Sequence, residues 1–205
     1  MNRREGIQQA KEASEIFERL GDVTKQAEAL INLAYVLHQD NQLDAAEEAT
    51  SRALNLLPEQ GEEFLVCSGH RALGGIYRSK GNTEKAIHHY EGALQIASFL
   101  NYHTELFWVH FVLADLFSSQ GRFSDSHPHI ECAKSHAVDD AYLLASMSWL
   151  QATFWAGQHM FEAKSEALCA LNAFEKLGAT DAAEHTRVLL GAIERGARGS
   201  ELGPG

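Results

Sequence analysis

The sequence predicts an all-α fold, a right-handed solenoid of antiparallel helix pairs, and three observations lead to this class. Apolar and small residues recur at helical spacings, whereas the long Val/Ile/Thr alternation typical of strands is absent. Only three prolines occur, and Ala, Leu and Glu are frequent, so the composition favours helix. The third observation is an internal repeat of about 40 residues, which is typical of stacked helical units.

The clearest copy of the repeat is RALGGIYRSKGNTEKAIHHYEGALQIA, residues 71–97, which reads as a helix, a glycine turn and a second helix. It is marked by a Leu-small pair, a turn residue and two small residues in the second helix. Equivalent sets recur at intervals of 40, 40 and 37 residues: Leu33-Ala34, Asn41, Ala46 and Ala53; Leu73-Gly74, Gly81, Ala86 and Ala93; Leu113-Ala114, Gly121, Ser126 and Ala133; Leu150-Gln151, Gln158, Ala163 and Ala170. Small residues let helix backbones approach closely, so we expect these positions to be buried between helices.

The elements are expected in a simple order. A single helix over 5–20, polar on one side, caps the start, and Gly21 ends it. Four helix pairs follow, at 24–57, 64–99, 104–137 and 141–177, and Pro58 stops the first of them. A last helix over 181–195 caps the other end, and the Gly-rich residues 196–205 form a flexible tail. These elements make one domain over 1–195. The alternative is one end of a longer array, with another helix upstream.

Charge and composition narrow the classes of partner and compartment. The formal net charge of -11 argues against non-specific binding to nucleic acid or to an anionic membrane, because both select for basic surfaces. No apolar run approaches the eighteen residues of a membrane span, and the first twenty residues lack the apolar core of a signal peptide. The three cysteines are widely spaced and odd in number, as in a reducing compartment. We therefore expect a soluble, cytoplasmic protein.

The repeat resembles the tetratricopeptide repeat (TPR). The family pattern places Leu-Gly, Tyr, Gly, Ala, Phe/Tyr and Ala at fixed offsets, and the best copy matches with Leu73-Gly74, Tyr77, Gly81, Ala86, Tyr90 and Ala93. The 40-residue period is similar to that of kinesin-light-chain-like arrays and of the TPR arrays of fungal signalling proteins that follow a NACHT or NB-ARC module. The GxxxxGK[ST] motif of such a module is absent.

The resemblance implies a concave groove, lined by the first helix of each pair, that binds a peptide or protein segment. Carried over by position, the groove residues are Asn32, Tyr35, His38, Arg71, Arg78, Trp108, Phe111, Asp115, Trp149 and Trp155. The polar residues among the first five suit a peptide backbone or carboxylate, with Asn32 as the sharpest single candidate. The aromatic residues of the later pairs suit an apolar anchor. Packing between adjacent repeats is the competing interpretation of each Trp, although the set as a whole favours a groove.

Two further kinds of site are weighed and set aside. His127, His129, Cys132 and His136 form an H-x-H-x2-C-x3-H run that would bring three metal ligands onto one helical face, but a His-rich polar surface is the preferred interpretation. No HExxH, GxSxG, GxGxxG or CxxC motif occurs. We therefore predict no metal, no cofactor and no enzymatic activity.

The sequence thus predicts a non-catalytic scaffold or adaptor that binds a peptide or protein segment. The alternative is the sensor or regulatory TPR portion of a larger signalling ATPase of the NACHT or NB-ARC type. A monomer is expected, with weak association through the ends as a third possibility.

Overall fold

The computed structural model describes residues 3–57, 61–137, 140–156 and 159–196, and all regular structure in these ranges is α-helical. The helices in the described part of the chain are α1 (Arg3–Leu20), α2 (Val23–Gln39), α3 (Leu43–Leu56), α4 (Glu63–Ser79), α5 (Thr83–Leu100), α6 (His103–Ser119), α7 (Phe123–His136), α8 (Ala141–Trp155), α9 (Met160–Lys176) and α10 (Thr180–Glu194). Every helix begins and ends within about two residues of the expected position. The all-α prediction is confirmed.

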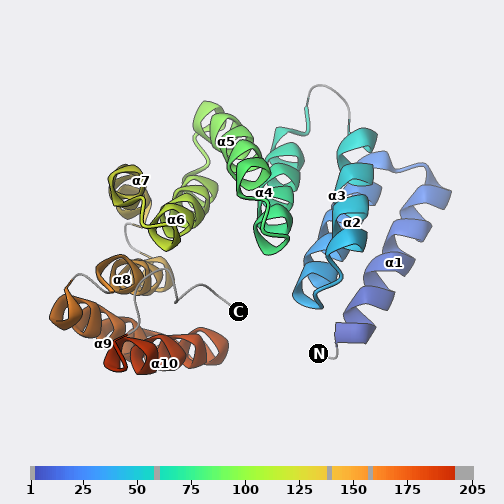
Figure 1. Ribbon diagram of the computed structural model, residues 1–205. Helices are drawn as coiled ribbons and strands as arrows, with labels where there is room; N and C mark the ends of the chain where they lie inside the picture. The colour runs from blue at the N-terminus through green and yellow to red at the C-terminus, as the bar shows by residue number, and fades with distance from the viewer. Residues whose placement is uncertain (1–2, 58–60, 138–139, 157–158, 197–205) are drawn as a thin grey trace. The chain divides into compact units, whose positions relative to one another are not determined.

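The helices form two compact units, unit 1 within residues 1–101 and unit 2 within residues 102–205. In unit 1, α1 packs on α2, α2 pairs with α3, and α4 pairs with α5 and also contacts α2 and α3 (Figure 1). In unit 2, α6 pairs with α7, α8 pairs with α9 and contacts α6 and α7, and α10 packs on α9 (Figure 1). Both units are therefore stacks of antiparallel helix pairs. A single domain over 1–195 stays a prediction.

In the part of the chain that the structure describes, one turn geometry closes five helices. Residues with positive φ follow α1, α2, α4, α6 and α9: Gly21, Asn41, Gly81, Gly121 and Gly178. At the first of them, the Gly21 amide donates to the Glu18 carbonyl, and the next amide, of Asp22, donates to the Phe17 carbonyl. The same two hydrogen bonds recur at the other four turns. This pattern satisfies carbonyls at the helix end and requires a left-handed residue, which Gly and Asn adopt at low cost.

The small residues of the repeat lie where helices meet. The two small positions of every second helix are completely buried: Ala46, Ala53, Ala86, Ala93, Ser126, Ala133, Ala163 and Ala170. Gly74 in α4 shows why size matters, because a Cβ built there would lie 2.5 Å from Cε1 of the buried Tyr90 ring. The small residues therefore recur at the repeat spacing because neighbouring helices touch at these positions.

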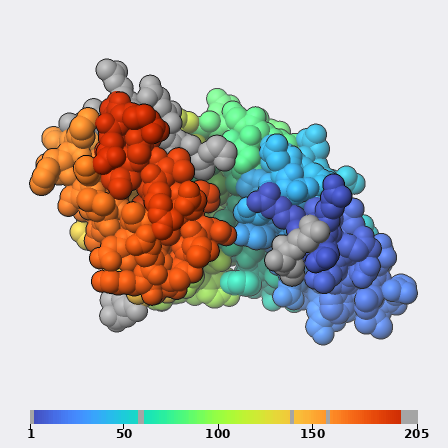
Figure 2. All heavy atoms as spheres, turned by 90° about the horizontal axis from the view of Figure 1, so that it is seen from below, coloured from blue at the N-terminus to red at the C-terminus, as the bar shows by residue number. Residues whose placement is uncertain are grey.

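The end helices of the described chain each pack on one neighbouring pair. In the space-filling view, α1 (dark blue) and α10 (red) lie at the surface of their units (Figure 2). The polar side expected of the first helix is exposed, at Gln8, Glu12, Glu15 and Arg19. In the described residues, no helix combines the length and the hydropathy that a membrane crossing needs. Three predicted features, the stop at Pro58, the turn at Gln158 and the tail, lie outside the described residues; only Gly196 of the tail is described.

Candidate functional site: the faces of the first helices

The polar candidates of unit 1 come from α2 and α4, which contact each other directly. Asn32 and Tyr35 lie three residues apart on α2, on the side opposite its buried residues, and Tyr35 is 62% exposed. An exposed Asn amide can both donate to and accept from a peptide backbone, and a Tyr ring offers contact area with a polar end. These two side chains are free to meet a ligand.

His38 lies at the place where α2 meets α4. Its Nε2 is 2.8 Å from Oγ of Ser79, and its ring lies over Gly75, where an added Cβ would be 3.4 Å from the imidazole Cε1. Burial lowers the pKa of His38, so the imidazole is neutral at pH 7. The structure therefore gives His38 an inter-repeat contact in addition to its predicted place on the face.

Arg71 and Arg78 are half-buried on α4, seven residues apart and hence two turns along one side of the helix. Arg78 directly precedes Ser79, the partner of His38. Unit 1 thus carries two half-buried guanidinium groups on α4 and an exposed amide and phenol on α2. A carboxylate or the carbonyls of an extended chain match these donors.

The aromatic candidates of unit 2 are half-buried. Trp108 and Phe111 on α6 have ring centroids 5.6 Å apart, and Phe111 stacks on Trp149 of α8 at 6.1 Å. All three pack against the core formed by α6, α7 and α8. These residues close the space between two helix pairs and present only part of their rings to solvent.

Packing and burial limit what three of the unit 2 candidates can offer to a ligand. Trp155 contacts Phe154 at 4.9 Å and His159 at 5.1 Å between ring centroids, and it packs against the same two apolar clusters as Trp149. Asp115 is only 6% exposed, so little of its carboxylate can reach a ligand. The indole Nε1 of Trp149 is buried and has no hydrogen-bond partner among the described residues. Packing thus accounts for more of this set than the sequence implied.

The His/Cys run of α7 does not assemble. His129 faces His110 and His136 faces His103, both on α6, whereas Cys132 is exposed. In the described part of the chain no three His, Cys, Asp or Glu side chains are grouped to hold a metal ion. The sequence placed these residues on one helix face, but their partners lie on the neighbouring helix.

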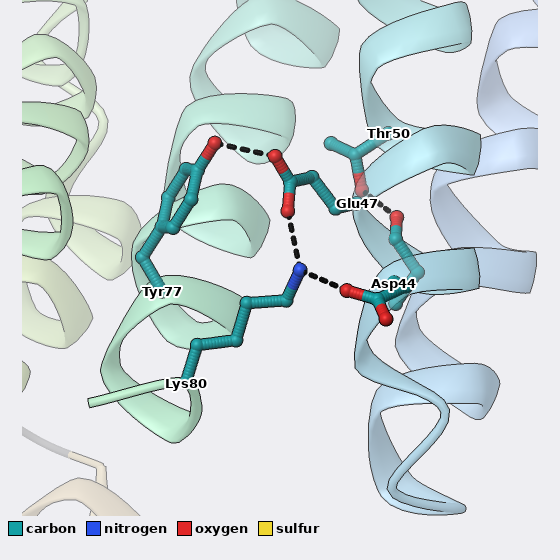
Figure 3. Close-up of polar contacts among 6 residues, drawn as sticks. Asp44, Glu47, Thr50, Tyr77 and Lys80 are labelled. Atoms are coloured by element: carbon teal, nitrogen blue, oxygen red, sulfur yellow. Dashed lines mark hydrogen bonds and ion pairs between the residues drawn. The ribbon is translucent and has the colours of Figure 1, made fainter. Parts of the chain in front are cut away.

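Sequence reasoning missed a polar network that joins α3 to α4. Oη of Tyr77 donates to Oε1 of Glu47 at 2.6 Å, and Nζ of Lys80 reaches Glu47 Oε2 at 2.6 Å and Asp44 Oδ1 at 2.5 Å (Figure 3). Nζ of Lys85 lies 4.7 Å from the centre of the Tyr77 ring. The pattern marked Tyr77 only as a large packing residue; the acidic partners on the previous helix were the available signal.

Mutual hydrogen bonding shifts the pKa values of this network. Hydrogen bonds from Lys80 and then Tyr77 lower the pKa of Glu47, although partial burial opposes the shift. The hydrogen bonds to Asp44 and Glu47 raise the pKa of Lys80 to about 12. The Glu47 carboxylate also raises the pKa of Tyr77. The group is therefore a fixed ion pair at neutral pH that holds two helix pairs in register.

A shallow cavity of about 210 Å³ lies elsewhere, at the turn between α9 and α10. Its wall includes Phe174, Gly178 and Ala183, with Arg187 held by Glu175 and Glu184. None of the predicted groove residues lines it. We give it no weight as a ligand site because its arginine is already neutralised by two carboxylates.

These features define a class of protein before they define a family: the chain is a helical-repeat protein built from stacked antiparallel helix pairs. Family models described as tetratricopeptide repeat match residues 27–59 and 65–135, together just over half of the chain. The chain belongs to the tetratricopeptide repeat family.

Solved structures support the same fold. The crystal structure of BtubC (BKLC) from P. vanneervenii matches with a TM-score of 0.75 and 19% identity, covering 98% of this chain and 87% of that one. A Rap protein complexed with Competence and Sporulation Factor matches with a TM-score of 0.72 and 14% identity, covering 95% of this chain. The match spans 59% of the Rap chain. No curated protein matches the sequence.

Proposed function

We propose that this chain is a non-catalytic interaction scaffold that binds a peptide or protein segment on the faces of its first helices. Membership in the tetratricopeptide repeat family supports the general role of a protein-interaction scaffold. The Rap structure adds that a fold of this kind can hold a bound partner. The observation that carries the proposal is the pair of exposed polar side chains of α2, Asn32 and Tyr35, on a helix that packs against α4.

Each unit, taken by itself, offers a different binding chemistry. In unit 1, Asn32 offers an exposed amide and Tyr35 an exposed phenol, which fit a peptide backbone. Arg71 and Arg78 of α4 already interact within the protein and add positive charge to the same unit. Trp108, Phe111, Trp149 and Trp155 offer partly exposed ring surface, which fits an apolar side chain. We leave Asp115 out of the contacting set because it is buried.

The proposal is tested with the double variant Asn32→Ala/Arg71→Ala. Affinity capture from cell lysate, quantified by mass spectrometry, is expected to lose a partner that the wild type enriches at least tenfold. The partner's segment is then made as a peptide and titrated by tryptophan fluorescence. Capture by the variant equal to that by the wild type would contradict the assignment of this face.

A matched control changes the same residue types on a second helix. Arg52→Ala/Asn55→Ala alters two exposed residues of α3 and removes the Arg52–Glu18 ion pair at 2.8 Å. An exposed pair of this kind is worth up to about 1 kcal/mol, so the control stays folded. We expect it to capture the same partner as the wild type, and circular dichroism verifies that both variants keep their helical content.

Two further expectations remain predictions. We expect a monomer, although Leu20 and Val188 are exposed apolar residues on the end helices of the described chain. Light scattering at high concentration tests association through those ends. The role of a regulatory TPR portion within a larger signalling ATPase would be decided by a nucleotide-binding module encoded in the same reading frame.

A further inference from the structure

Three pairs of histidines face each other across helix pairs, and we call them the histidine rungs: His70–His89, His110–His129 and His103–His136. The first joins α4 to α5, and the other two join α6 to α7. In every rung the closest ring atoms are the two Nδ1 nitrogens, at 3.2, 2.9 and 3.2 Å respectively. The same contact is thus made three times by three different pairs of side chains.

The rungs follow the repeat. His110 stands 40 residues after His70, and His129 stands 40 residues after His89. The equivalent positions of the first helix pair hold Leu30 and Ala49, both buried. Two successive repeats therefore place an imidazole pair where the preceding repeat packs apolar side chains. His103 and His136 lie seven residues from this rung, two turns further along the same helices.

The facing nitrogens limit how many protons a rung can hold. In a neutral pair, one Nδ1 carries the hydrogen and donates it to the other, and that arrangement survives one additional proton elsewhere on the rings. A doubly charged pair places two Nδ1–H groups and two positive charges against each other. At separations near 3 Å that arrangement breaks the hydrogen bond and repels.

The α8 side of the unit 2 rungs supplies no counter-charge. From α8, which packs on α6 and α7, no Asp, Glu, Lys, Arg or His faces them, because Ala141–Trp155 contains none and its one phenol, Tyr142, contacts Trp108. The α6 carboxylates Glu105 and Asp115 are buried, and on α7 Asp125, Glu131 and Lys134 are exposed. His129 stacks on Phe117, and His136 lies over His110.

The unit 1 rung has both a positive and a negative group near it. His88 lies edge-on to His89, and Tyr77 of α4 stacks on it. The Lys85 ammonium opposes protonation of His89, whereas Glu47 of α3 favours it. Because one carboxylate helps this rung, we expect it to respond less strongly to acid than the two rungs of unit 2.

We propose that the histidine rungs make the packing of α4 on α5 and of α6 on α7 sensitive to pH, so that these helix pairs loosen as the pH falls from about 7 to 5.

The pKa values support the direction. Burial, followed by neighbouring imidazoles, lowers the pKa of His70, His89 and His136, and lowers that of His110 to about 4. The unfolded chain, with ordinary histidines near 6.5, then binds more protons than the folded one. Stability is therefore full above about pH 6.5 and is lost as the pH falls toward the lowered values.

The test uses the full chain and its melting temperature between pH 8 and pH 4.5, followed by circular dichroism. The variant His129→Gln/His136→Gln removes the α7 half of both unit 2 rungs. We expect the fall in melting temperature between pH 7.5 and pH 5 to shrink to half of the wild-type value or less. His185→Gln, at an exposed position of α10, is the matched control and keeps the wild-type fall. An unchanged fall in the double variant overturns the proposal.

Two measurements on the unaltered chain guard against a variant that fails to fold. Histidine NMR signals are expected to include several with a pKa below the ordinary 6.5, that of His110 near 4, and eleven signals all titrating near 6.5 contradict the proposal. Hydrogen exchange at pH 5, corrected for the intrinsic rate, is expected to accelerate in α4–α7 more than in α1 or α10. Uniform acceleration of exchange over all helices contradicts the proposal.

Added Zn²⁺ tests whether the rungs are metal sites instead. If Zn²⁺ stabilises the wild type at pH 7.5 and does not stabilise the double variant, the rungs bind metal and the proposal is wrong.

Discussion

Unit 1 and unit 2 differ in the side chains that lie between consecutive helix pairs. In unit 1, the seam between consecutive helix pairs is closed at its edge by the network of Asp44, Glu47, Tyr77 and Lys80, which we call the polar seam. In unit 2, the contact between the first helices of consecutive pairs, α6 and α8, is filled by Phe107, Trp108, Phe111 and Trp149, which we call the aromatic seam. Both units have small residues at the repeat positions where helices touch. The arrangement of the helices therefore depends on these small residues, whereas the side chains between consecutive pairs can differ.

This difference has an energetic and a functional side. Aromatic burial is non-directional and large, whereas an exposed ion-pair network contributes little net stability but fixes register. The polar seam leaves the α2–α4 face of unit 1 to carry exposed donors. The aromatic seam uses most of its ring surface for packing, which explains why the unit 2 candidates are half-buried.

The largest expected effect comes from the aromatic seam. Phe107 is completely buried among α6, α7 and α8, so Phe107→Ala should cost about 3–5 kcal/mol in the free energy of unfolding. Urea denaturation monitored by circular dichroism measures it. The control Phe161→Ala removes a ring that is 83% exposed and should change stability by less than about 0.5 kcal/mol. Similar costs for the two variants would show that the seam does not stabilise unit 2.

Adjacent glycines of α4 test the shared small positions. Gly74→Ala should cost about 1–3 kcal/mol, because its Cβ would lie 2.5 Å from the buried Tyr90 ring. Gly75→Ala meets its nearest atom at 3.4 Å and gains helix propensity, so it should be neutral or stabilising by up to about 1 kcal/mol. Both variants gain the same propensity, so their difference in urea midpoint isolates the clash. No difference would remove close approach as the reason for Gly74.

The polar seam should give a smaller, pH-dependent effect. Glu47→Gln is expected to cost about 1 kcal/mol at pH 7, and Glu48→Gln, an exposed neighbour on the same helix, close to nothing. Because the pKa of Glu47 is lowered in the folded protein, its contribution is present at neutral pH and is lost as the pH falls through that lowered value. Unfolding curves from pH 7 to 3 should therefore show the two variants converging. A constant gap would contradict the network.

The smallest expected effect concerns the buried indole N–H of Trp149 in the aromatic seam. Trp149→Phe removes a buried indole N–H that has no partner in the described structure, and this relief offsets the smaller ring. We expect a change within about 1 kcal/mol, against a loss of about 3 kcal/mol or more for Trp149→Ala. Calorimetric melting of both variants provides the comparison. A large loss in the Phe variant would mean that the N–H is bonded in solution.

Much of the fold was predictable from the sequence because it depends on local rules. Gly81 and Gly121 were visible as turn residues 40 residues apart, and Gly21 as the residue that ends the first helix, and each has the positive φ that the turn requires. The small positions were visible because steric exclusion between helices acts at the same place in every repeat. Asn32 and Tyr35 were carried over by position from the family resemblance, and both are exposed on α2.

The remaining features depended on partners that no local pattern identifies. Asp115, carried over as a groove residue, is buried, and Trp149 is drawn into packing by Phe111 on another helix. His129 and His136 were grouped with Cys132 along one helix, yet each pairs with a histidine of α6. Side chains compete for neighbours across the helix pair, and only the tertiary structure decides which contact is made. By itself, the sequence determined the helices, their turns and the repeat family; the tertiary structure decided which polar and aromatic groups are available to a ligand.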